Sequence, residues 1–260
     1  MEYFETHAHY DDEKFNEDRD EVIKKIFDSG VTKCVNIGCD IVTSRNSIEL
    51  ANKYDFIYAT CGIQPSEIPS IEEELDSDIK QLENMIRNTK KVVAIGEIGL
   101  DYNWNSDNKD MQRKAFIKQI ELANNLNLPI SIHTRDAIDD TISIIKNEVD
   151  IQAGGILHCC PFNRELVKHG LEKGLHIAFG GTCTFKNSKN AKEIVQMVPM
   201  ERILIETDSP YLAPEPLRGT RNDSSNLKYI VDKIGEFKKM SSEEIARITY
   251  ENAKKLYRIN

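Results

Sequence analysis

Short apolar runs alternate with longer segments of helical periodicity along nearly the whole chain. Each run is four or five residues long, which is typical of buried strands. The runs lie at residues 3–6, 33–37, 57–61, 92–96, 130–133, 155–158, 176–179 and 203–206. The pattern therefore predicts eight strands.

Nearly every one of these runs is followed by a segment with helical spacing. These segments lie near residues 17–29, 43–53, 71–88, 108–126, 137–148, 162–173 and 187–197, and two more, 224–238 and 242–257, follow an irregular stretch at 209–223. Ser241 and Glu244 have the spacing of a capping box at the start of the last helix.

Eight strands with helices between them favour a (β/α)8 TIM barrel over an open doubly wound sheet. The open sheet stays an alternative, but the chain has neither a G-x-G-x-x-G motif after its first strand nor a P-loop. We see no repeat, linker or break in composition. We therefore expect an α/β fold in which residues 1–260 form a single-domain barrel with an extra C-terminal helix.

The charge of the chain limits the partners that it can bind. Lys and Arg number 34 and Asp and Glu number 43, so the net charge is −9. This balance argues against coating duplex nucleic acid by charge alone. It does not exclude phosphodiester chemistry, because bound metal ions supply local positive charge to a phosphate.

The cysteines and the apolar runs indicate the cellular compartment in which the protein is expected. Six cysteines lie in or beside apolar runs, without the spacing of a disulfide framework, and no secretory signal is recognisable. No apolar run approaches the roughly 20 residues needed to span a bilayer. We expect reduced thiols and a cytoplasmic protein.

Histidines and acids gather at the ends of the predicted strands. They are His7, His9, Glu97, His133, His158 and Asp208. Each alone has an ordinary interpretation as a hydrogen-bonded core or loop residue. In a parallel barrel, however, the C-terminal ends of all strands meet at one rim, where the active sites of such barrels lie. Side chains at i and i+2 of an extended chain point the same way, so His7 and His9 can reach one ion.

Two acids complete this candidate metal site. Glu97 lies between Gly96 and Gly99, and one carboxylate can bridge two cations. Glu206 and Asp208 follow the last strand on the same side. Imidazoles and carboxylates suit Zn, Mn, Fe or Co, whereas carboxylates and water suit Mg. The sequence thus predicts two divalent metal ions, Mg, Mn or Zn, without deciding among them.

Six segments, in order along nearly the whole chain, resemble the TatD family of metal-dependent deoxyribonucleases within the amidohydrolase-like barrels. They are Thr-His-Ala-His (6–9), Ile-Gly-Glu-Ile-Gly-Leu-Asp-Tyr (95–102), Ile-His-Thr-Arg-Asp-Ala (132–137), Leu-His-Cys (157–159), Glu-Thr-Asp-Ser-Pro-Tyr-Leu-Ala-Pro (206–214) and Arg-Gly-Thr-Arg-Asn (218–222). The second and the fifth segments are the most specific.

The resemblance implies how the ligands are shared. His7, His9 and Asp208 would hold one ion, His133 and His158 the other, and Glu97 both. It also implies hydrolysis of DNA phosphodiester bonds as a 3′-5′ exonuclease, with single-stranded DNA or 3′ ends as the substrate. From the short apolar runs we expect no membrane association, and the sequence leaves protein partners open.

The chain departs from the family pattern at four places. Glu5 stands where an aspartate is usual, and Gln64 and Ser66 stand where relatives usually carry histidines. Residues 159–162 read Cys-Cys-Pro-Phe, with Cys160 and Pro161 in place of the usual Phe and Ser or Thr, and Asp-Ser-Ser follows Asn222. None of these departures removes a predicted metal ligand. They therefore leave the expected hydrolysis unchanged and concern only the identity of the substrate.

We predict three catalytic residues. Two metal ions about 3.5–4 Å apart can polarise a phosphoryl oxygen and activate a water. Asp208 is the candidate proton acceptor, Glu97 the shared ligand, and Glu206 the candidate partner that orients a histidine ligand. An ordinary interpretation of Glu206 is an acid bonded to backbone amides.

Five residues are candidates for binding substrate. Arg135, Arg218 and Arg221 have the geometry to bind phosphate oxygens, and Tyr102 and Trp104 can stack on a base. Each has an alternative as a surface or loop-packing residue. Two other functions also stay open: a hydrolase of another phosphoester, ester or amide, and a metal-binding barrel without turnover.

Overall fold

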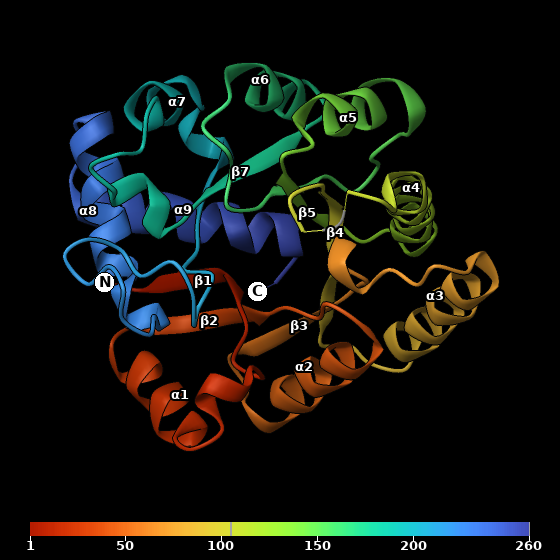
Figure 1. Ribbon diagram of the computed structural model, residues 1–260. Coiled ribbons are helices and arrows are strands. Elements are labelled where there is room, and N and C mark those ends of the chain that lie inside the picture. Colours follow the sequence, from red (N-terminus) through yellow and green to blue (C-terminus); the bar gives the residue numbers. More distant parts are fainter. Residues whose placement is uncertain (105, 260) are drawn as a thin grey trace.

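A computed structural model describes residues 1–104 and 106–259, in which eight parallel strands form one sheet in sequence order (Figure 1). The strands are β1 (Tyr3–Ala8), β2 (Val31–Asn36), β3 (Ile57–Cys61), β4 (Val92–Asp101), β5 (Ile130–Arg135), β6 (Gly155–Leu157), β7 (Leu175–Phe179) and β8 (Ile203–Ile205). Each strand pairs with the next, which is the neighbour relation of a barrel.

Helices connect successive strands on the outside of this sheet (Figure 1). They are α1 (Arg19–Asp28), α2 (Ile41–Lys53), α3 (Glu72–Arg87), α4 (Lys109–Leu126), α5 (Ile138–Ser143), α6 (Arg164–Glu172) and α7 (Ala191–Met197), followed after β8 by α8 (Leu227–Lys238) and α9 (Ser242–Tyr257). Ser241 and Glu244 form the capping box that their spacing predicts at the start of α9.

The barrel closes where β8 returns to β1. Ala8 and Ser209 form a parallel bridge, and the His9 amide donates to the Ser209 carbonyl at 2.7 Å. The buried Glu5 carboxylate accepts from the amides of His7 and Thr207 at 3.0 and 2.9 Å, and therefore ties the two strands together. Eight strands thus form a nearly closed single-domain barrel, as the alternation of patterns predicts.

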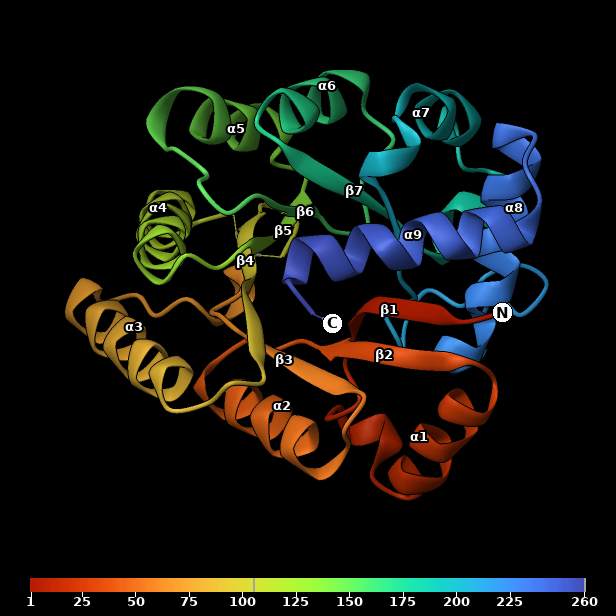
Figure 2. The ribbon, with the colours of Figure 1, turned by 180° about the vertical axis from the view of Figure 1, so that it is seen from behind.

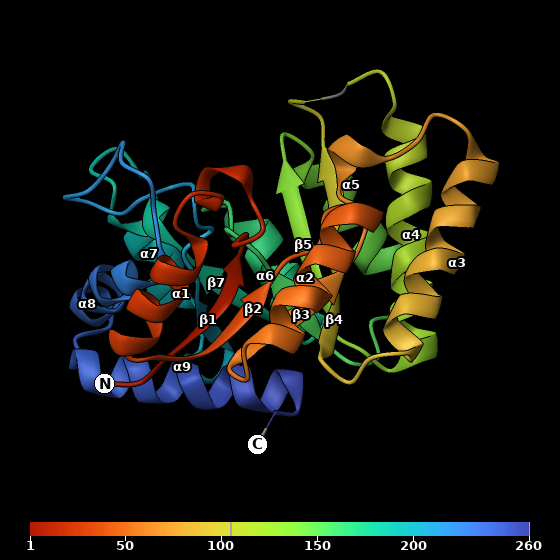
Figure 3. The same ribbon diagram turned by 90° about the horizontal axis from the view of Figure 1, so that it is seen from below.

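Helix α9 covers the N-terminal end of the barrel. Figure 2 shows it crossing in front of the strands, and Figure 3 shows it at the same end as both termini, opposite the loops that follow the strands. Its Leu256 and Tyr257 belong to the core cluster that fills the interior with Phe4 and Val35. The Tyr257 hydroxyl also donates to the Thr6 carbonyl at 3.3 Å. Side chains close this end, so a ligand site has to lie at the other.

Several elements end at residues that the sequence pattern does not predict. Strand β4 runs five residues beyond 96, to Asp101, and β5 extends to Arg135. A π-helical turn (Ile144–Glu148) follows α5, and a 3-10 turn (Gly181–Thr184) follows β7. All six cysteines are free. Within the described ranges, no helix combines the length and the apolar character that crossing a membrane requires.

Candidate metal centre

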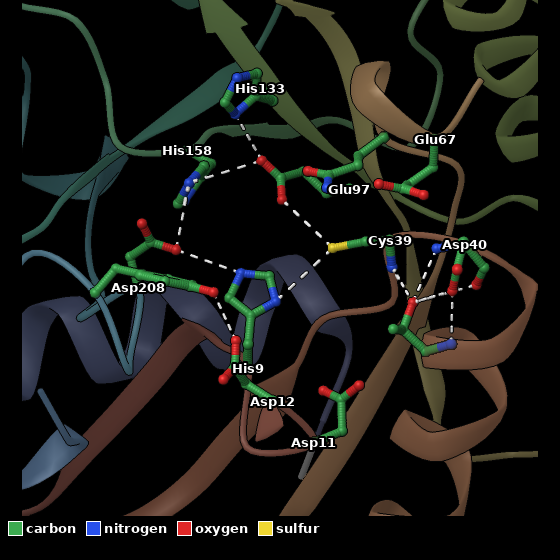
Figure 4. A pocket seen from close by; sticks show the side chains of 13 residues that line it. His9, Asp11, Asp12, Cys39, Asp40, Glu67, Glu97, His133, His158 and Asp208 are labelled. Carbon is green, nitrogen blue, oxygen red and sulfur yellow. Dashed lines mark hydrogen bonds and ion pairs between the residues drawn. The ribbon is translucent and has the colours of Figure 1, made fainter. Parts of the chain in front are cut away.

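The six residues predicted as ligands meet at the C-terminal mouth of the barrel. His7, Glu97 and His158 are buried, while His9, His133 and Asp208 are partly exposed. All but His7 line a cavity of about 400 Å³ (Figure 4). The side chains come from β1, β4 and β5 and from the residues that directly follow β1, β6 and β8. The structure therefore brings together all six of them.

His7, His9 and Asp208 form one compact group of donors. The Nε2 atoms of His7 and His9 lie 3.2 Å apart. Asp208 Oδ1 lies 3.3 Å from His9 Nε2 and 3.7 Å from His7 Nε2. The left-handed backbone of Asp208, with φ 58°, aims this carboxylate, and its amide donates to the His7 carbonyl at 2.9 Å. The closing bonds of the barrel thus also hold this group in place.

The carboxylate of Glu97 faces both sides of the centre. Its Oε1 lies 2.8 Å from His133 Nδ1 and 3.9 Å from His158 Nε2. Its Oε2 lies 3.7 Å from His7 Nε2. One oxygen is therefore directed at each half of the donor set, which is the arrangement that a shared ligand requires.

Glu97 and His133 lie close together because β4 and β5 approach closely at Gly99. A Cβ at Gly99, where φ is +142°, would lie 2.0 Å from the His133 carbonyl oxygen. Gly99 and His133 are register partners, and the register shifts between Ile95 and Ile98, on either side of Glu97. The glycine is therefore required for this approach of the two strands.

The distances among these atoms suit a metal ion. Two ligand atoms that each lie about 2.0–2.2 Å from an ion, at tetrahedral or octahedral angles, are about 2.8–3.6 Å apart. The closest pairs of the first group, at 3.2 and 3.3 Å, match this separation. His7 with His9 and Asp208, and His7 with Glu97 and His158, each form a set of donors that can hold one ion. His133 lies beside these donors, and its Nδ1 contacts Glu97 Oε1.

Two carboxylates lie beside the ring nitrogens of His158 and His133 that point away from the rest of the donor set. Glu206 Oε1 lies 3.0 Å from His158 Nδ1 and accepts the Cys159 amide at 2.6 Å. Asp101 Oδ2 lies 3.0 Å from His133 Nε2. Carboxylates in this position fix the tautomer and the orientation of a metal-binding imidazole. Sequence reasoning proposed this position for Glu206 but missed Asp101. Side chains alternate between the two faces of a strand, so a strand that continues past Glu97 places Asp101 on the same face as Glu97. This alternation was the available signal.

Charge is balanced tightly within the centre. Burial opposes ionisation of Glu97, but the neighbouring imidazoles, His133 foremost, hold the pKa of its carboxyl well below its usual range. Burial also opposes protonation of His133, yet Glu97 and Asp101 raise the pKa of its ring to about 10. The carboxylates therefore attract positive charge to this spot, which is what a divalent cation supplies.

The five predicted substrate residues lie outside the cavity. Arg221 forms a two-pronged ion pair with Asp18, at 2.8 and 2.5 Å, and Arg218 lies over the ring of Phe185. The Tyr102 hydroxyl donates to Asp140 at 2.5 Å. Arg135 is exposed, and Trp104 is 73% exposed. None of the five is among the described residues that line the cavity.

The wall of the cavity beside the predicted ligands is acidic. Asp11, Asp12, Asp40 and Glu67 line it, and no Lys or Arg occurs among the described lining residues. Gln64, one of the departures from the family pattern, is also part of this wall. Positive charge for a bound anion would therefore come from the histidines or from bound metal ions, and not from Lys or Arg.

A (β/α)8 barrel with histidines and carboxylates at the C-terminal ends of its strands defines the class of metal-dependent barrel hydrolases. Comparison with known proteins agrees with this class. The TatD related DNase family matches residues 4–258. The metal-dependent hydrolase YabD of Bacillus subtilis is 45% identical over 257 residues, 99% of each chain.

Two further relatives are described as TatD proteins. The 3′-5′ ssDNA/RNA exonuclease TatD of Escherichia coli K12 is 31% identical over 251 residues, 95% of each chain. The crystal structure of YJJV, a TatD homolog from the same organism, has a TM-score of 0.91 at 25% identity and covers 99% of this chain and 98% of its own. The chain belongs to the TatD family of metal-dependent hydrolases.

Proposed function

We propose that this protein is a 3′-5′ exonuclease that removes nucleotides from single-stranded DNA and uses two divalent metal ions held by the six clustered ligands. The observation that carries the proposal is the position of Glu97, whose two oxygens face different halves of the donor set. The relative named as a single-strand exonuclease supports the choice of substrate. The cytoplasmic location expected from the sequence stays a prediction.

The residues of the chain have distinct tasks in this proposal. When bound, a pair of divalent ions polarises a phosphoryl oxygen and lowers the pKa of a water. Asp208 lines the cavity, and its carboxylate is positioned to accept the proton of an attacking water. Glu206 and Asp101 keep His158 and His133 in the orientation that presents their inner nitrogens to the centre.

The acidic wall favours a strand end over the middle of a polyanion. Asp12 and Asp40 lie in the wall, and neither forms an ion pair with Lys or Arg within the described structure. Like charges repel at short range, so a second phosphate beside the centre is disfavoured. A terminal nucleoside with free hydroxyl groups can instead donate hydrogen bonds to these carboxylates.

The same wall also supports a second candidate function. A small uncharged ester or amide would enter an acidic cavity without repulsion. The five cationic and aromatic residues expected to bind DNA lie outside that cavity. Hydrolysis of such a substrate would use the same six ligands.

A labelled oligonucleotide separates the two candidates. Single-stranded DNA that carries a 5′ label is incubated with the protein and Mg²⁺ or Mn²⁺, beside a panel of ester, lactone and amide substrates. We expect a ladder of shortened products that keep the label, and no such ladder with Glu97→Gln. A matched variant on the surface of α6, Glu165→Gln, retains the activity. Intact DNA together with turnover of one of the small substrates would replace the first candidate with the second.

A further inference from the structure

Cys39 places a thiol at the edge of the metal centre, outside the six predicted ligands. It follows β2 and precedes Asp40, the residue that caps α2. Its amide donates to Thr43 Oγ1 at 2.8 Å, and its carbonyl accepts the Gln64 amide at 2.8 Å. The backbone is therefore held on both sides, and the side chain lines the cavity (Figure 4).

The sulfur lies between two of the predicted ligands. Cys39 Sγ is 3.8 Å from His9 Nδ1 and 3.9 Å from Glu97 Oε2, both within reach of a hydrogen bond to sulfur. The other ring nitrogen of His9, Nε2, faces His7 and Asp208. The thiol therefore meets the nitrogen of His9 that is turned away from the first group of donors.

A histidine that binds a metal through one nitrogen keeps its proton on the other, and this proton needs an acceptor. His158 has Glu206 in that place and His133 has Asp101, each at 3.0 Å. For His9 the atom in the equivalent place is the sulfur of Cys39. The same thiol can direct its own proton to Glu97 Oε2.

We propose that Cys39 is a positioning residue of the metal centre, which accepts a hydrogen bond from His9 Nδ1–H and donates one to Glu97. The bond fixes the tautomer in which His9 Nε2 is free to bind an ion. The inference rests on the proposed metal function and adds a residue to it. A thiol is a weaker acceptor than a carboxylate, so His9 is held less firmly than His133 and His158.

Binding of Mn²⁺ to the metal-free protein tests this role without an activity assay. Titrations followed by the electron paramagnetic resonance of free Mn²⁺ give the affinity of each ion for the wild type and for Cys39→Ala, Cys39→Ser and Cys183→Ala. Loss of an outer partner typically weakens metal binding by about 10–100-fold. We expect such a loss at one of the two ions in Cys39→Ala and recovery of most of it in Cys39→Ser. Cys183→Ala, which changes a buried cysteine outside the cavity, keeps the wild-type affinities.

Two results would overturn the positioning role. One is equal Mn²⁺ affinity in the wild type and in a folded Cys39→Ala variant, with folding checked by circular dichroism. The other is a sulfur-to-metal charge-transfer band of the Co²⁺-loaded wild type that disappears in Cys39→Ser, since the sulfur would then be a ligand. A wild type that binds no Mn²⁺ and no Co²⁺ would instead refute the proposed metal function itself.

Discussion

The two oxygens of Glu97 face different halves of the centre, so this side chain decides whether two ions share a ligand. Glu97 is not a surface acid, because it is 3% exposed and lies among His7, His133 and His158. We infer that neither half of the donor set is complete without it.

Glu97→Ala is therefore expected to lose nearly all hydrolysis while the barrel stays folded. Loss of an outer partner costs about 10–100-fold in metal affinity or activity, and loss of a shared ligand has to cost more. Circular dichroism and activity measured on the same sample check this. An active, folded Glu97→Ala protein would refute the bridging role.

Glu206 is expected to act only through His158. Glu206→Gln keeps the size of the side chain but replaces the carboxylate beside His158 Nδ1 with an amide. We expect the affinity for one ion to fall by about 10–100-fold, measured by competition with a chelator. Glu201→Gln, on the opposite end of β8, provides the matched control and leaves the affinity unchanged. An unchanged affinity in Glu206→Gln would mean that the acid serves only the Cys159 amide.

At the scale of the elements, the strand β7 carries a buried histidine that has no part in the centre. His176 is 8% exposed, and its Nδ1 has no hydrogen-bond partner among the residues that the structure describes. Burial, and then the nearby Arg202, lower the pKa of its ring to about 4. An unfolded chain binds this proton near pH 6.5, so the unfolded state gains protons relative to the folded state between pH 6.5 and 4. His176 therefore reduces stability as the pH falls through that range.

We expect His176→Gln to weaken this dependence. For the metal-free wild type the histidine alone lowers the free energy of unfolding by on the order of 2 kcal/mol between pH 7 and 5. Urea unfolding at both pH values, with chelator in every sample, measures the difference between the two proteins. Equal losses of stability in wild type and variant would contradict the buried, neutral state of this ring.

The sequence predicts the elements well where a local pattern decides them. Eight apolar runs and the capping box of α9 are local, and all of them are found in the fold. The end of β4 is not local. Gly96 and Gly99 suggest a turn, but β5 pairs with β4 as far as Asp101 and keeps it extended. A partner strand more than 30 residues away leaves no trace in the pattern, and Asp101 was missed for that reason.

Contacts between distant residues are equally hard to predict at the C-terminal mouth of the barrel. Arg221 was a candidate for binding phosphate because of its guanidinium group, and this stays a prediction. The structure pairs the guanidinium with Asp18, 203 residues earlier in the chain. Such a pairing depends on how α1 and the loop after β8 meet in space. The convergence of the six ligands was predictable, because it follows from the parallel order of the strands alone.

At the scale of the whole molecule, activity should depend on metal ions because no Lys or Arg occurs among the described residues of the cavity wall. We expect dialysis against a chelator to remove hydrolysis, and Mn²⁺ or Mg²⁺ to restore at least part of it. Inductively coupled plasma mass spectrometry on the same samples gives the metal content. A metal-free preparation that works as well as the reloaded one would contradict the mechanism.

The most direct test of the two-metal centre is anomalous diffraction from a crystal grown with Mn²⁺. We expect two anomalous peaks about 3.5–4 Å apart, one among His7, His9 and Asp208 and one beside His133 and His158, with Glu97 between them. The absence of any peak within this cluster, or peaks only on other faces of the barrel, would contradict it.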